Sequence, residues 1–84
     1  MVHYCFSRHA KMQMQERGAS EAEIIETIET GEKIPAKRGR SAYRKNFQFN
    51  DRWGDKTYAI KQVMPVVASE EQKIVVITVY TFYF

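Results

Sequence analysis

The chain has 84 residues, of which 44% are hydrophobic and 13% aromatic, and its formal net charge at pH 7 is +3. This length supports one domain, residues 1–84, with a single core, and excludes a two-domain enzyme that carries its own nucleotide-binding fold. The hydrophobic content argues against disorder. The longest apolar run, residues 74–84, is about half of the roughly 20 residues that a spanning helix needs, so no membrane contact is expected.

The only cysteine, Cys5, cannot form an internal disulfide, which is typical of a reducing compartment. The amino-terminal segment does not resemble a secretion signal, because charged and histidine residues interrupt its apolar residues. We therefore expect a cytoplasmic protein. His3, Cys5 and His9 do not follow an ordinary zinc spacing, and no glycine-rich phosphate loop is present, so we expect neither a metal nor a cofactor.

The first part of the chain has the pattern of two short helices. Apolar residues recur at i and i+4 from roughly residue 7 to residue 17, and Gly18 then ends the segment. Ser20 followed by Glu23 forms a capping-box pattern that opens a second helix, and Gly31 stops it.

The second part alternates with the period of β-strands. Strands are predicted over 43–49, 56–64 and 73–82, with a hairpin loop at 50–55 and with Pro65 ending or bending the second strand. The sequence therefore predicts an α+β domain, with two amino-terminal helices packed on three or four antiparallel strands.

Charge is segregated along the chain. Residues 21–32 include five acidic side chains and no basic one, whereas residues 33–45 include six basic side chains and no acidic one. A basic stretch favours anionic partners such as RNA. The alternative is an ordinary solvated loop that follows an acidic helix.

If the apolar faces of the strands all meet the helices, a polar set lines the opposite face of the sheet. This face would offer cations, amides and hydroxyls to phosphate groups. The alternative is an ordinary solvated sheet face. The set consists of Arg44, Asn46, Gln48, Thr57, Lys61, Thr78 and Tyr80.

His9 is a candidate acid or base, because its usual pKa lies near neutrality. Gln13 and Arg17 follow it at i+4 and i+8 on one helical stripe, where they could hold a phosphate beside it. The alternative is a capping or packing histidine. Residues 82–84, Phe-Tyr-Phe, are either a surface patch for a partner or a strand that continues into the core.

The opening block, Ser-Arg-His-Ala at 7–10, Met14, Glu-Arg-Gly at 16–18 and Ser-Glu-Ala-Glu at 20–23, resembles the start of the bacterial domain-of-unknown-function 4258 family. The closing Val-Ile-Thr-Val-Tyr at 76–80 resembles its last strand. The resemblance implies a fold like that of RelE- and BrnT-type toxins, small ribonucleases often paired with an antitoxin.

By this resemblance His9 corresponds to the family histidine, Arg17 to its second arginine, and Thr78 and Tyr80 to polar positions of the last strand. Gln13 stands where the family has its first arginine, and an amide cannot neutralise a phosphate.

Our leading hypothesis is a metal-independent endoribonuclease that activates a ribose 2′-hydroxyl against the neighbouring phosphate. The alternative is a non-catalytic RNA-binding or protein-interaction module, paired with an antitoxin or forming a homodimer. The predicted catalytic residues are His9, Tyr80 and Arg17. The predicted RNA-binding residues are Arg44, Lys61, Gln13, Thr78 and Arg40.

Overall fold

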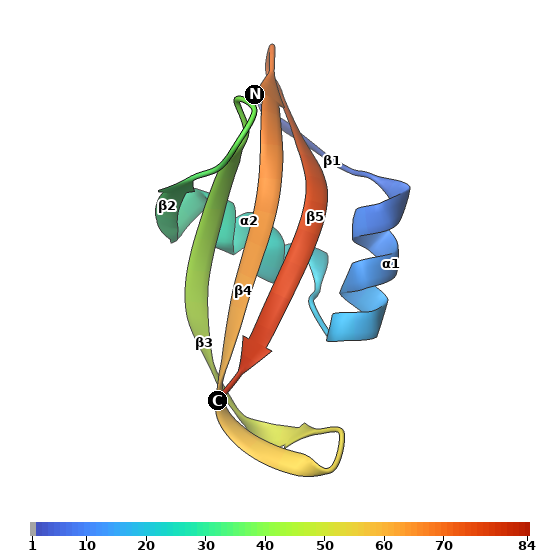
Figure 1. Ribbon diagram of the computed structural model, residues 1–84, viewed down its shortest axis with the longest axis vertical. Coiled ribbons are helices and arrows are strands. Elements are labelled where there is room, and N and C mark those ends of the chain that lie inside the picture. Colours follow the sequence, from blue (N-terminus) through green and yellow to red (C-terminus); the bar gives the residue numbers. More distant parts are fainter. Residues whose placement is uncertain (1) are drawn as a thin grey trace.

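The computed structural model describes residues 2–84, and in this range two helices accompany one five-stranded sheet (Figure 1). The elements in chain order are β1 (His3–Phe6), α1 (Arg8–Arg17), α2 (Glu21–Thr30), β2 (Glu32–Pro35), β3 (Ser41–Trp53), β4 (Lys56–Glu70) and β5 (Lys73–Tyr83). The strand order in the sheet is β1-β5-β4-β3-β2. β1 runs parallel to β5, and all other neighbouring strands are antiparallel.

The α+β class and the two helices are confirmed, but the sheet differs from the prediction. It is mixed rather than antiparallel, and it has five strands rather than three or four. The two strands that the prediction lacks, β1 and β2, have four residues each and lie at the two edges of the sheet. Four residues are too few for a strand period to stand out in the sequence.

Local capping sets the helix ends. The Ser7 hydroxyl accepts a hydrogen bond from the backbone N–H of Ala10, and Gly18 ends α1 in the left-handed conformation at φ 77°. Ser20 and Glu23 form the predicted capping box at the start of α2, with reciprocal side-chain to backbone bonds of 3.0 and 3.1 Å. Both helices therefore begin and end close to where the sequence predicts.

The helices cover one face of the sheet, with α2 behind β3 and β4 and α1 along β5 (Figure 1). The core lies between the two layers, because burying the apolar stripe of each helix against the sheet is what stabilises such a domain. The buried residues of this core are Ala10, Ala19, Ile24, Ile28, Val63, Val67, Val76 and Val79.

The strand β4 continues past Pro65, where the sequence predicted that it either ends or bends. Ile60 and Phe84 exchange both backbone hydrogen bonds, so the odd-numbered residues of β4 turn their backbone groups toward β3. Because proline has no N–H, one hydrogen bond between β4 and β3 is missing at Pro65. The hydrogen bonds between β4 and β5 are not affected by this residue. The pairs on either side of it, Lys45 with Val63 and Ala42 with Val66, keep one register, and this holds the strand together.

The hairpin of β3 and β4 extends beyond the rest of the sheet and curls at its end (Figure 1). A shift of register between Gln48 and Asp51, with Asn50 at φ 47°, marks a bulge that bends the ribbon. The bend brings Trp53 onto the ring of Tyr83, with centroids 4.9 Å apart and an interplanar angle of 15°.

Candidate nucleic-acid interface

The side of the sheet away from the helices has no covering element within residues 2–84, and we call it the open face. Side chains alternate between the two sides of a strand, so the residues that alternate with the core residues of each strand lie on the open face. The open face includes Arg44, Asn46 and Gln48 on β3, Ile60, Gln62, Met64 and Val66 on β4, Thr78, Tyr80 and Phe82 on β5, and Phe84. Glu32 of β2, the register partner of Arg44, lies at the edge of the same face.

Two aromatic rings stand side by side on this face. Tyr80 and Phe82 are 39% and 42% exposed, their centroids are 6.4 Å apart, and their planes differ by only 13°. The guanidinium carbon of Arg17 lies 5.3 Å from the centre of the Tyr80 ring, within the range of a cation–π interaction. Rings exposed in this way offer flat apolar surfaces to solvent.

A polar row crosses the sheet beside the rings. Asn46 pairs with Gln62 across β3 and β4, and Gln62 pairs with Phe82 across β4 and β5. The side-chain amide of Gln62 donates a 2.9 Å hydrogen bond to the amide oxygen of Asn46. Next to this row Arg44 forms a 2.8 Å ion pair with Glu32 of β2, and both side chains are about half exposed or more.

Gln13 and Arg17 lie along β5, as the predicted stripe requires, but both bind the strand. The Gln13 amide oxygen accepts a 2.8 Å hydrogen bond from the backbone N–H of Val79, and Gln13 is buried. Arg17 donates a 2.6 Å bond to the carbonyl oxygen of the same residue. These two side chains complete the hydrogen bonds of β5 where β1 has already ended.

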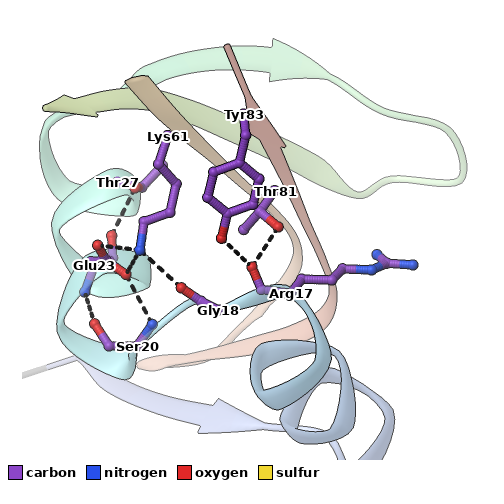
Figure 2. A network of polar contacts seen from close by, with 8 residues as sticks. All are labelled: Arg17, Gly18, Ser20, Glu23, Thr27, Lys61, Thr81 and Tyr83. Atoms are coloured by element: carbon purple, nitrogen blue, oxygen red, sulfur yellow. Dashed lines mark hydrogen bonds and ion pairs between the residues drawn. The ribbon is translucent and has the colours of Figure 1, made fainter. Parts of the chain in front are cut away.

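Lys61 does not lie on the open face, contrary to the prediction. It points to the helices, and its side chain is only 9% exposed (Figure 2). Its ammonium group donates 2.8 Å hydrogen bonds to the carbonyl oxygen of Gly18 and to the carboxylate of Glu23. In β4 the apolar Ile60 and Met64 lie on the open face, whereas Lys61 and Val63 are buried against the helices, so the two faces of this strand are the reverse of the predicted ones.

The same network fastens the turn between the helices to β5 (Figure 2). The hydroxyls of Thr81 and Tyr83 both donate to the carbonyl oxygen of Arg17, at 2.8 and 2.6 Å. Burial raises the pKa of the Tyr83 phenol, the hydrogen bond with Thr81 opposes this, and the charge of Glu23 adds to the rise. These groups hold the fold together and face away from the open face.

The remaining predicted residues are dispersed. His9 is exposed on α1, and none of the side-chain hydrogen bonds among residues 2–84 involves it. It precedes Arg17 by eight residues, which corresponds to about 12 Å along a helix. Arg40 is exposed in the connection between β2 and β3, Thr57 is exposed near the tip of the hairpin, and Thr78 is half-buried on the open face.

The structure thus brings together Arg17, Tyr80 and Arg44 around one face, and it buries Lys61 and Gln13 away from that face. Sequence reasoning missed Gln62, and it named Phe82 only as part of the carboxy-terminal patch at 82–84, although the two residues lie next to each other on this face. The alternation of β5 carried the signal for Phe82, since it lies two residues after Tyr80 and therefore on the same side. Phe82 and Phe84 are exposed, whereas Tyr83 faces the helices. The end of the chain therefore contributes both to an apolar surface patch and to the packing against the helices.

Comparison with known proteins assigns a family. Residues 6–81 match the family described as Domain of unknown function (DUF4258). The chain belongs to this family. No match to a curated protein or to a solved structure was found. Within the part of the chain that the structure describes, neither helix is long and apolar enough to cross a membrane.

Proposed function

We propose that this member of the DUF4258 family binds single-stranded RNA on its open face. The observation that carries the proposal is the pair of exposed, nearly parallel rings of Tyr80 and Phe82, with the guanidinium of Arg17 against the first ring. Sheets that bind RNA use aromatic residues in this manner, because unpaired bases stack on them. Stacking on a protein ring contributes about 1–3 kcal/mol per base.

Charge favours an anionic partner for the same face. Arg17 and Arg44 flank the rings and the amide row, and the connection before β3 adds exposed Lys37, Arg38 and Arg40. Cations that contact phosphates release counterions, and this gives RNA binding its salt dependence. The acidic side chain nearest in register, Glu32, is paired with Arg44.

The test is the affinity of the protein for a fluorescent single-stranded RNA of about 12 nucleotides, measured by anisotropy. We expect Tyr80→Ala and Phe82→Ala each to weaken binding at least about fivefold. Met12→Ala is the matched control, because Met12 is 56% exposed on α1 and is not part of the open face. Equal affinities for all four proteins would refute the proposal.

Salt dependence provides an independent check. Arg44→Gln should reduce the slope of log affinity against log salt by about 0.7 if Arg44 contacts one phosphate. The slope is measured between about 50 and about 200 mM salt. An unchanged slope would remove Arg44 from the binding surface.

Cleavage of the bound RNA is a second candidate function, favoured by the contact between Arg17 and Tyr80, two of the predicted catalytic residues. His9, the third, lies about two helical turns from Arg17, so it would act at a neighbouring phosphate. Labelled RNA incubated with the protein in EDTA tests this. We expect His9→Ala to abolish any cleavage while binding persists, and unchanged cleavage would exclude His9 from the chemistry.

A protein partner, whether an antitoxin or a second copy of the chain, would use the apolar centre of the same face. Ile60, Met64 and Val66 are half-buried there, and Phe84 is 58% exposed beside them. Size-exclusion chromatography at several concentrations tests self-association. A dimer that Phe84→Ser disrupts, and that does not bind RNA, would favour this function over RNA binding.

A further inference from the structure

The row Asn46–Gln62–Phe82 combines a stacking surface with amide groups that can recognise a base. The three residues are opposite one another on three adjacent strands. Neighbouring strands lie about 4.8 Å apart, so Gln62 is one strand and Asn46 two strands away from the ring. A base stacked on Phe82 and oriented across the sheet would therefore place its polar edge over Gln62.

The hydrogen bond between the two amides fixes what they present. Gln62 donates one N–H to the Asn46 oxygen. The carbonyl oxygen and the second N–H of the Gln62 amide remain available. Asn46 accepts this bond with its oxygen and keeps both N–H groups. Gln62 is thereby positioned by Asn46, and it offers one acceptor and one donor to a ligand.

We propose that this row is an adenine-selective base subsite; the inference rests on the proposed RNA-binding function. A carboxamide pairs in two hydrogen bonds with the amino group and the ring nitrogen of adenine, whereas the acceptor pair of guanine prefers arginine or lysine. Adenine also has the larger ring system for stacking on Phe82 than cytosine or uracil. The 42% exposure of Phe82 leaves the ring accessible.

Binding of oligo(A), oligo(C) and oligo(U) RNA of equal length, measured by anisotropy, tests the subsite. The wild-type protein should bind oligo(A) between about 5-fold and about 100-fold more tightly than the other two. Gln62→Ala should reduce this preference, because it removes the hydrogen bonds to adenine and leaves only the stacking on Phe82. Asn46→Ala should weaken the preference, because it releases the Gln62 amide.

Gln48→Ala is the matched control, since Gln48 is an exposed amide on the same face but lies opposite Ile60, outside the row. It should keep the preference, and circular dichroism should show that all variants are folded. Equal binding of the three RNAs by the wild type would overturn the subsite and leave the proposed RNA-binding function standing. Failure to bind any RNA would overturn both the subsite and the proposed function. A preference for oligo(A) that Gln62→Ala leaves undiminished would overturn the subsite alone.

Discussion

The replacement Lys61→Met tests whether a buried ammonium group holds the turn between the helices against the sheet. Methionine keeps a flexible apolar side chain of similar length and removes only the charge and its hydrogen bonds. In the wild type this ammonium contacts the Gly18 carbonyl oxygen and the Glu23 carboxylate, each at 2.8 Å. The side chain of Lys61 is only 9% exposed, so both contacts are largely shielded from water.

The magnitude follows from these contacts. Loss of a charged hydrogen bond to Gly18 costs about 1.5–3 kcal/mol, and breaking a buried pair by removing one partner costs about 3–5 kcal/mol in all. The Glu23 side chain is 25% exposed, so water can rehydrate its carboxylate in part. We therefore expect a loss of about 3 kcal/mol of unfolding free energy, near the lower end of that range.

Thermal unfolding followed by circular dichroism measures this loss. For a domain of this size, about 3 kcal/mol corresponds to a fall of roughly 12–24 °C in Tm. Lys45→Met is the control, because Lys45 forms a 2.7 Å pair with Glu26 in which the two side chains are 30% and 51% exposed. An exposed pair contributes about 0–1 kcal/mol. If both variants lost the same stability, burial would not be what gives Lys61 its effect.

Three further replacements test other contacts. Gln13→Leu should cost about 1–3 kcal/mol in urea unfolding, because the N–H of Val79 loses its acceptor; unchanged stability would return Gln13 to the candidate phosphate ligands. Gly18→Ala should cost at least about 1–2 kcal/mol, since φ is 77° and a Cβ would lie 2.8 Å from Trp53; a Tm within a few degrees of the wild type would contradict this. Burial raises the pKa of Tyr83 above its usual 10.0, so its contribution is complete below about pH 10 and is lost as pH rises through the folded-state pKa. The stability difference between the wild type and Tyr83→Phe should therefore shrink above pH 10, and a difference that grows there would contradict the sign.

The helices were predictable because their signals are local. A serine hydroxyl that caps a helix, or a glycine that adopts φ 77°, acts on atoms within a few residues of itself. Ser20, Glu23 and Gly18 therefore specify their conformations before any tertiary contact exists. The long strands were predictable for the same reason, since alternation shows over eleven or more residues.

The two edge strands depended on partners distant in the chain. β1 exists because residues 3–6 pair with residues 73–76, and nothing in four residues indicates that pairing. The continuation of β4 through Pro65 likewise depends on neighbours on both sides, which hold the register where one hydrogen bond is missing. Tertiary pairing outweighed the local tendency of proline to end a strand.

The sequence alone is enough to predict the α+β class, both helices and the open-face positions of Arg44, Asn46, Gln48 and Tyr80. Which side of β4 is buried depends on long-range packing, because that strand carries apolar residues on both sides and the charge of Lys61 on the buried side is neutralised by Glu23 from α2. The same packing committed Gln13 to the backbone of β5 and set Gln62 beside Phe82. Residue types show what chemistry a chain can offer, whereas long-range pairing decides which groups remain free to offer it.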